Sequence, residues 1–183
     1  MAIQIQDLPL NGLRLIEPPV HTDPRGYFFE LHHQARFEQL GLDATLVQDN
    51  VSRSRRDVLR GLHFQAPAWQ GKLVSVLQGE IFDVAVDLRR GSPTYGGWAS
   101  VTLSDRDHRQ LWIPPGCAHG FYVLSEVADV EYKCTAPYAP AAERVIRWDD
   151  PDLAIAWPLD GGVPVVSPKD AGGLAFRDAP ACG

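Results

Sequence analysis

From about residue 59 onward, the chain consists of short runs rich in Val, Ile and aromatic residues, separated by Gly, Pro, Asp and Ser. In the clearest run, residues 80–88, the even-numbered positions from Phe82 to Leu88 are apolar, while Asp83 and Asp87 fall on the other face. This two-residue period is typical of β-strands. Similar runs predict strands at residues 72–77, 98–103, 110–113, 121–124, 129–134 and 144–148, and Gln78-Gly79-Glu80 predicts a hairpin turn.

Helical periodicity is weak by comparison. In the first half of the chain it predicts one short peripheral helix over residues 34–42, where Phe37 and Leu40 precede a glycine stop at Gly41. Without crossover helices, antiparallel strands at this spacing must close into a barrel or stack as two sheets. The pattern therefore predicts an all-β jelly roll. At 183 residues the chain fits a single domain, 1–183, whose Pro- and Asp-rich segment from about residue 149 wraps the barrel.

Charge and composition limit the classes of binding partner and the cellular location that we expect. The net charge of −6 argues against nucleic acid and membrane surfaces, and the 16 glycines and 15 prolines fit many short elements joined by turns. The first 15 residues lack the pattern of a secretion signal, which favours the cytoplasm. Cys117, Cys134 and Cys182 have the spacing of neither a disulfide framework nor a zinc ribbon, so we expect reduced thiols, two of them in the core.

Two histidines have informative neighbours, His63 in residues 59–65 (LRGLHFQ) and His119 in residues 114–120 (PPGCAHG). The second stretch resembles the Pro-x-Gly-x-x-His motif of the cupin superfamily, in which histidines from two motifs often hold a metal. The first stretch lacks the second histidine and the glutamate of the other cupin motif. A metal site would need a further ligand, such as Asp83 or Glu143. A hydrogen-bonded core residue is the plainer interpretation of either histidine alone, but two histidines on adjacent strands favour a functional site.

Proton transfer is the chemistry that suits a metal-free histidine best, because its ordinary pKa lies near neutral pH. Alternation in residues 129–134 places Tyr132 on the inward face, where it could act as an acid or simply fill the core. Lys72 follows a glycine at a strand start and could stabilise an oxyanion or lie in solvent.

A basic stretch at residues 52–57 precedes Arg60, and such arginines could bind phosphate or form a hydrated loop. In a regular strand Arg60 and His63 face opposite sides, so a shared site requires a bend at Gly61.

Six separated segments together resemble the dTDP-4-dehydrorhamnose 3,5-epimerase family. They are residues 23–30 (DPRGYFFE), 48–50 (QDN), 59–65 (LRGLHFQ), 71–74 (GKLV), 112–121 (WIPPGCAHGF) and 167–170 (SPKD), within a match from about residue 3 to about residue 177. The resemblance implies a cupin-type jelly roll without metal or other cofactor, a homodimer, and a dTDP-4-keto-6-deoxyhexose substrate.

The same resemblance implies a role for each matching residue. His63 would be the base, oriented by Asp170, Tyr132 the proton donor, and Lys72 the group that stabilises the enolate oxygen. His119 would line the sugar site and Tyr138 would stack near the thymine. The remaining nucleotide-sugar ligands would be Arg25, Glu30, Gln48, Asn50, Arg60, Glu143 and Lys169.

Three other functions stay open at this point. Relatives that epimerise only C3 or only C5 share these residues, so the sequence leaves the reacting carbon undecided. The cupin-like motif also allows a metal-dependent oxygenase. A sugar-binding cupin without catalytic activity is the third.

Overall fold

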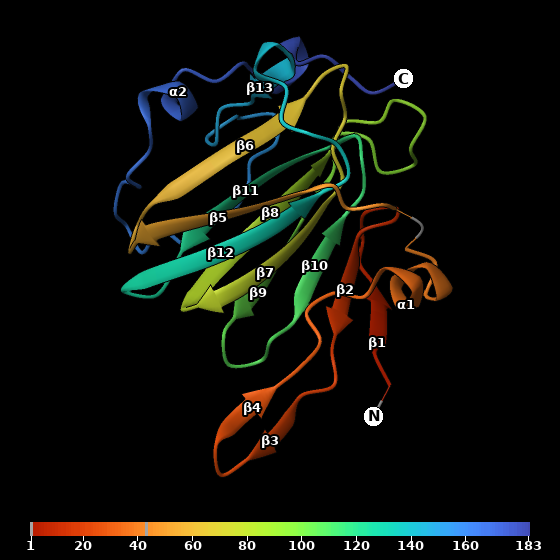
Figure 1. The fold of residues 1–183 in the computed structure, drawn as a ribbon. Coiled ribbons are helices and arrows are strands. Elements are labelled where there is room, and N and C mark those ends of the chain that lie inside the picture. The colour runs from red at the N-terminus through yellow and green to blue at the C-terminus, as the bar shows by residue number, and fades with distance from the viewer. Residues whose placement is uncertain (1, 43) are drawn as a thin grey trace.

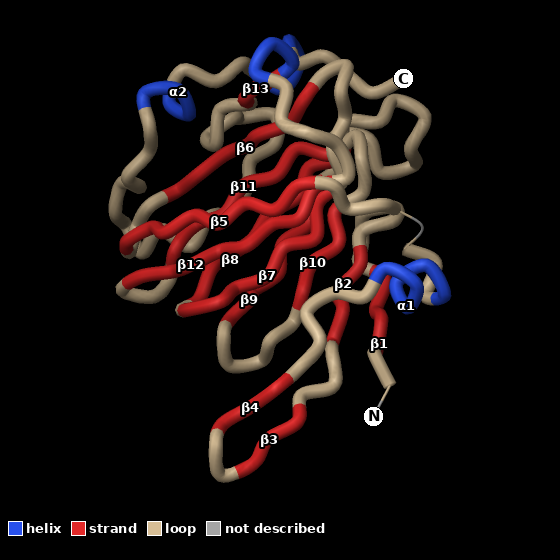
Figure 2. Tube along the Cα trace, viewed as in Figure 1, coloured by secondary structure: helices blue, strands red, loops and turns tan. Residues whose placement is uncertain are grey.

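The computed structural model describes residues 2–42 and 44–183, which form two stacked antiparallel sheets and a separate hairpin (Figures 1 and 2). In spatial order, the six-stranded sheet contains β1 (Gln4–Asp7), β2 (Arg14–Glu17), β10 (Gln110–Ile113), β7 (Lys72–Gln78), β12 (Val127–Cys134) and β5 (Gln48–Arg55). The five-stranded sheet contains β13 (Glu143–Val145), β6 (Leu59–Gln65), β11 (Cys117–Val123), β8 (Glu80–Asp87) and β9 (Trp98–Ser104). The hairpin pairs β3 (His21–Asp23) with β4 (Gly26–Phe28).

Helices are few and peripheral: α1 (Gln34–Gln39), α2 (Pro168–Ala171), and the 3₁₀ turns Pro140–Ala142 and Phe176–Asp178. The predicted cupin-type jelly roll is confirmed, as two open sheets packed face to face rather than as a closed barrel. Helix α1 ends three residues earlier than predicted, with Phe37 as its buried anchor.

The prediction of a hairpin at Gln78-Gly79-Glu80 is wrong. The chain does turn there, but β7 belongs to one sheet and β8 to the other, so the turn carries the chain across the sandwich. Gly79 has a φ of 85°, and a Cβ at this position would lie 2.1 Å from the Val127 oxygen. The residue types of a turn thus indicate that the chain reverses direction, but they do not show whether the two flanking strands pair with each other.

One apolar cluster fills the space between the sheets, with Val74 and Leu111 from one sheet and Phe121 and Val123 from the other. A second cluster lies on the outer face of the five-stranded sheet, where Leu153 and Trp157 belong to the segment after β13. That segment contacts the body as the sequence suggested; the division into a single domain stays a prediction.

The two clusters explain why β8 is buried on both faces. The even-numbered apolar residues, such as Val84 and Val86, belong to the outer cluster under the C-terminal segment. Ala85 belongs to the cluster between the sheets, and Asp83, which shares its face, is fully buried. The alternation predicted for this strand is present. Its more polar face, which carries Asp83, is turned toward the other sheet, and its apolar face is turned toward the C-terminal segment.

Strands β6 and β11 approach each other at two glycines. A Cβ on Gly61 would lie 2.6 Å from the Gly120 Cα atom, and a Cβ on Gly120 would lie 2.7 Å from the Arg60 oxygen. The pairing changes register here, from His119 opposite His63 to Phe121 opposite Arg60. Strand β6 thus contains one extra residue, the β-bulge that the sequence required at Gly61.

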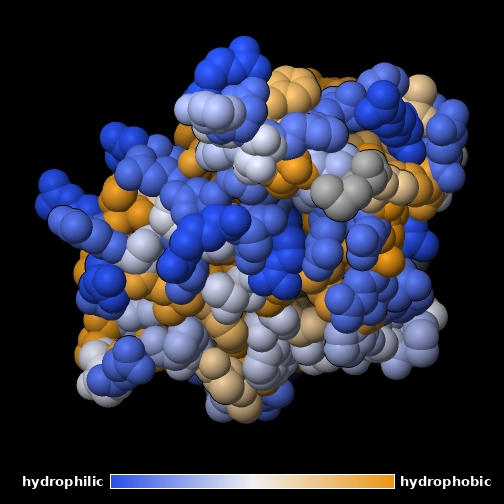
Figure 3. All heavy atoms as spheres, turned by 90° about the horizontal axis from the view of Figure 1, so that it is seen from below, coloured by the Kyte–Doolittle hydropathy of each residue, from blue (hydrophilic) through white to orange (hydrophobic). Residues whose placement is uncertain are grey.

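The β3–β4 hairpin projects from the body at the bottom of Figure 1. On β4 of this hairpin, Tyr27 and Phe28 are 57% and 72% exposed. Figure 3, which views the molecule from below, shows hydrophilic residues over most of this side with hydrophobic residues between them. In the part of the chain that the structure describes, no helix has the length and apolar character needed to cross a membrane.

Replacement of Gly61 by alanine should lower the free energy of unfolding by about 2–4 kcal/mol, because the φ of 124° is strained for alanine and the new Cβ meets β11. Gly91→Ala is the matched control, since a Cβ there has open space. Denaturant unfolding of both variants checks this, and equal stability of the two would contradict it.

Candidate functional site

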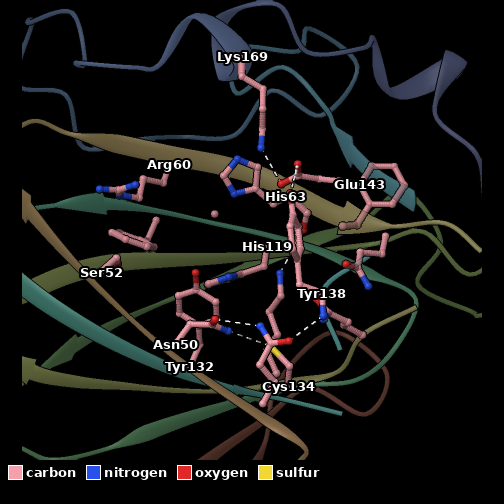
Figure 4. Close-up of a pocket in the computed structure, with 17 residues that line it drawn as sticks. Asn50, Ser52, Arg60, His63, His119, Tyr132, Cys134, Tyr138, Glu143 and Lys169 are labelled. Atoms are coloured by element: carbon pink, nitrogen blue, oxygen red, sulfur yellow. Dashed lines mark hydrogen bonds and ion pairs between the residues drawn. The ribbon is translucent and has the colours of Figure 1, made fainter. Parts of the chain in front are cut away.

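A cavity of about 380 Å³ lies between the two sheets and receives side chains from both. It brings together most of the predicted site residues, which come from six strands, the segment between β12 and β13, and the C-terminal segment (Figure 4). Those lining it are Gln48, Asn50, Arg60, His63, Lys72, His119, Tyr132, Tyr138, Glu143 and Lys169. Arg60 and His63 share the cavity although they are three positions apart, as the bulge at Gly61 allows.

His63 is held from behind by Asp170. The His63 Nε2 atom lies 2.6 Å from Asp170 Oδ1. Because a carboxylate oxygen accepts, this contact favours, for a neutral ring, the tautomer with the proton on Nε2 and the lone pair on Nδ1. Burial favours the neutral form of Asp170, but hydrogen bonds from His63 and its other partners outweigh this and lower the pKa of Asp170. Asp170 lies on α2, where its main-chain N–H donates to the capping Ser167 Oγ at 3.1 Å.

Tyr132 faces His63 across the cavity. Tyr132 comes from β12 in the six-stranded sheet and His63 from β6 in the other sheet, and in Figure 4 the Tyr132 hydroxyl points into the space between them. Burial raises the pKa of Tyr132, with the nearby cations Arg60 and Lys169 opposing the shift. The hydroxyl is therefore protonated at neutral pH and available as a donor.

Lys72 is buried at the start of β7, only 7% exposed, and its Nζ donates to the His63 main-chain oxygen at 3.3 Å. Burial lowers the pKa of Lys72, while nearby Cys134 and Asp83 oppose this. An ammonium group in a low-dielectric pocket stabilises negative charge more strongly than one in water. The solvent-exposed interpretation of Lys72 is wrong.

His119 forms a second buried pair. Its Nε2 lies 3.0 and 2.9 Å from the two oxygens of Asp83, which is fully buried on β8. Burial lowers the pKa of His119, and the Asp83 carboxylate opposes this shift. The sequence named Asp83 only as a possible metal ligand, whereas the structure makes it the hydrogen-bond partner that orients His119.

At the mouth of the cavity, Glu143 joins two other predicted residues. Lys169 Nζ lies 2.6 Å from Glu143 Oε1, and the Tyr138 hydroxyl donates to Glu143 Oε2 at 2.9 Å. Burial opposes ionisation of Glu143, but the hydrogen bonds from Lys169 and Tyr138 lower its pKa. The Tyr138 ring remains half exposed and available for stacking.

Arg25 and Glu30 do not line this cavity within one chain. Arg25 lies on the β3–β4 hairpin, where it pairs with Asp23, and Glu30 pairs with Arg36 at 3.0 Å. The cavity that holds His63 therefore does not include these two residues, and their predicted contact with the substrate stays a prediction.

The cavity also contains residues that the sequence did not single out. Ser52 follows Gln48 and Asn50 on the same face of β5, and its buried Oγ has no hydrogen-bond partner among the residues that the structure describes. Gln65 and Cys134 share strands with His63 and Tyr132. The two-residue period of a strand could have identified Ser52 and Cys134, because they lie two positions after the predicted site residues Asn50 and Tyr132.

Comparison with known proteins relates this geometry to a family. The family model for dTDP-4-dehydrorhamnose 3,5-epimerase matches residues 7–178. The Pseudomonas aeruginosa protein of that name is 56% identical over 173 residues, covering 94% of this chain and 95% of the relative. A Neisseria gonorrhoeae protein of the same name is 50% identical over 97% of this chain, which spans about half (54%) of that relative's length. The chain belongs to the dTDP-4-dehydrorhamnose 3,5-epimerase family.

A solved structure agrees with this membership in both fold and sequence. The crystal structure of dTDP-6-deoxy-D-glucose-3,5-epimerase from Legionella pneumophila, in complex with dTDP-4-keto-L-rhamnose, superposes with a TM-score of 0.94. It is 51% identical and covers 98% of this chain and 95% of that one. Within residues 2–42 and 44–183 of this family member, no group of three or more His, Cys, Asp or Glu side chains is arranged to hold a metal ion.

Replacement of Asp170 by asparagine should change the tautomer of His63. The carboxylate accepts from Nε2–H, whereas an asparagine amide can donate to Nε2 and so favour the form protonated at Nδ1. Nitrogen-15 NMR of the ring should show Nε2 protonated in the parent protein and a shift towards Nδ1 protonation in Asp170→Asn. Asp178→Asn, in a neighbouring turn, is the control, and an unchanged His63 spectrum in Asp170→Asn would contradict the assignment.

Proposed function

We propose that this protein epimerises dTDP-4-dehydro-6-deoxy-D-glucose at C3 and C5 to give dTDP-4-dehydro-L-rhamnose. The observation that carries the proposal is the placement of His63 and Tyr132 on opposite sheets, facing one cavity, with the buried Lys72 beside them. Epimerisation requires a base on one face of the sugar ring and an acid on the other.

The 4-keto group makes the C–H bonds on both neighbouring carbons acidic. His63 Nδ1 takes the proton from carbon, and the electron pair of the C–H bond moves into an enolate whose oxygen Lys72 stabilises. The Tyr132 hydroxyl then gives its proton to the opposite face of the same carbon. The configuration inverts, and the step leaves a histidinium and a tyrosinate that exchange protons with water before the next event.

The remaining side chains fit a sugar nucleotide. Arg60 and Lys169 supply positive charge for the diphosphate, and the Tyr138 ring is exposed for stacking on the thymine. His119 lines the sugar site. The side chains of Gln48, Asn50 and Glu143 supply further hydrogen-bonding groups along the cavity.

Incubation with dTDP-4-dehydro-6-deoxy-D-glucose in heavy water tests the proposal directly. Proton NMR should show deuterium entering at both C3 and C5. His63→Ala should slow this exchange by about 10²–10⁴-fold, because the general base is lost. Tyr132→Phe should reduce epimerised product more than it reduces exchange, because proton removal by His63 remains possible.

The other functions are distinguished by other results of this experiment and by metal analysis of the purified protein. Deuterium at one carbon only would assign a C3-only or C5-only epimerase. Binding of the sugar nucleotide without exchange would make the protein a sugar-binding cupin. If the purified protein contains stoichiometric iron, manganese or nickel, and a chelator removes both the metal and the activity, the protein would be a metal-dependent cupin oxygenase.

We further propose that the protein acts as a homodimer in which the β3–β4 hairpin completes the partner's cavity. The hairpin projects from the body and exposes Tyr27 and Phe28, which favours contact with another protein surface (Figure 1). Arg25 is carried on it, away from the chain's own cavity. A second copy would bring Arg25 and Glu30 to the substrate.

Mixed dimers test this arrangement. A mixture of Arg25→Ala and His63→Ala chains should recover about a quarter of the parent activity, because half of the dimers are mixed and one of their two sites is intact. The control mixes His63→Ala chains with Tyr132→Phe chains. Both residues line the cavity of the same chain, so this mixture should be no more active than the two variants measured separately. Equal recovery in both mixtures would overturn the exchange of hairpins.

We also place the protein in the cytoplasm and treat residues 1–183 as a single domain with a wrapping segment from about residue 149. Support for the first comes from the free thiols of Cys117, Cys134 and Cys182, which suit a reducing compartment. Support for the second comes from Leu153 and Trp157, which pack on the five-stranded sheet.

A further inference from the structure

The segment that follows β12 carries Tyr138 and is fixed by a side chain from another strand. Gln65, the last residue of β6, is 3% exposed. Its Nε2 donates to the main-chain oxygens of Ala68 at 2.8 Å and Pro137 at 3.3 Å, and its Oε1 accepts from the Ala139 N–H at 2.7 Å. One buried amide therefore binds the main chain on both sides of Tyr138.

Neighbouring side chains hold the same segment. Gln48 Oε1 accepts from the Tyr138 N–H at 2.7 Å, and Gln70 Nε2 donates to the Ala136 oxygen at 2.6 Å. Gln65 also lies directly opposite Glu143 in the pairing of β6 with β13, and Glu143 accepts the Tyr138 hydroxyl. The main chain and the hydroxyl of Tyr138 are thus both anchored, while its ring is half exposed.

This combination fits a preorganised stacking surface. A ring that must stack on a planar base gains affinity when its position is already fixed, because less conformational entropy is lost on binding. Anchoring through the main chain leaves the aromatic face free. Gln65 reaches the segment from β6, the strand that also carries Arg60 and His63, so the stacking surface is tied to the reacting end of the cavity.

We propose that Gln65 is a positioning residue for the nucleobase, which acts by holding residues 137–139 so that Tyr138 presents its ring to the thymine. The proposal rests on the proposed function, since it assumes that the ligand is a thymidine nucleotide. It separates two parts of the substrate: Gln65 governs recognition of the base, and it contributes little to the diphosphate or to proton transfer.

Gln65→Met tests the proposal, because methionine keeps the length of the side chain and removes all three hydrogen bonds. The dissociation constant for dTDP, measured by calorimetry, should rise about tenfold. The dissociation constant for inorganic pyrophosphate, which has no base, should stay within about twofold of the parent value, since the lost hydrogen bonds to Pro137 and Ala139 hold only the segment that carries Tyr138. In turnover, KM should rise about tenfold while kcat changes less than about twofold.

Gln34→Met is the matched control, because this glutamine on α1 also donates to a main-chain oxygen, that of Ala44 at 3.3 Å, but lies outside the cavity. It should bind both ligands like the parent protein. Gln65→Asn is the second variant if Gln65→Met does not fold. It keeps an uncharged amide in the cavity but is one methylene shorter, so it cannot hold Pro137 and Ala139 as Gln65 does, and the same selective loss of dTDP affinity is expected.

Parallel weakening of dTDP and pyrophosphate would show a general disturbance of the cavity and overturn the proposal, as would unchanged dTDP affinity or a fall in kcat at constant KM. Failure of the proposed function gives a different result. In that case the parent protein itself would neither bind dTDP nor catalyse isotope exchange. If the parent does both and Gln65→Met is indistinguishable from it, only the role of Gln65 is refuted.

Discussion

The close contact between Gly61 of β6 and Gly120 of β11 is the constraint on which the site depends. Two residues without side chains let the strands approach more closely than any Cβ permits, and β6 accommodates its extra residue at that point. The bulge reverses the alternation of side chains, so Arg60 and His63 reach the same cavity. A regular strand would place Arg60 and His63 on opposite faces of the sheet.

The cavity places ionisable groups where a sandwich normally has apolar packing, and each is compensated locally. Asp83 is fully buried but contacts His119, and the negative charge of Asp83 also opposes the effect of burial on Lys72. Burial favours the neutral form of every such group, and hydrogen bonds restore the charged form only where a partner is close. The pKa of Asp170 is lowered and that of Tyr132 is raised, so Asp170 stays ionised and Tyr132 stays protonated over a wider pH range than in water.

Sequence reasoning succeeded where side-chain period and local chemistry agreed. It placed the strands after residue 59, turned Tyr132 inward and identified the bend at Gly61. Strand β5 escaped notice because its inward positions, such as Gln48 and Asn50, are polar, so the strand has no apolar alternation to detect. The crossing at Gly79 and the buried polar face of β8 depend on which sheet each strand joins, and neither is a local property of the sequence.

The C-terminal segment contacts the rest of the chain in two ways, by apolar packing on a sheet and by a hydrogen bond in the cavity. Leu153 and Trp157 seal the outer face of the five-stranded sheet, and further along the same segment Asp170 orients His63. Leu59 and Val165 join the segment to β6 through a main-chain hydrogen bond of 2.9 Å. A sub-global opening that lifts this segment would therefore uncover apolar surface and release the histidine from its partner in one event. The cover over the outer face of the sheet and the orientation of His63 thus depend on the attachment of one segment.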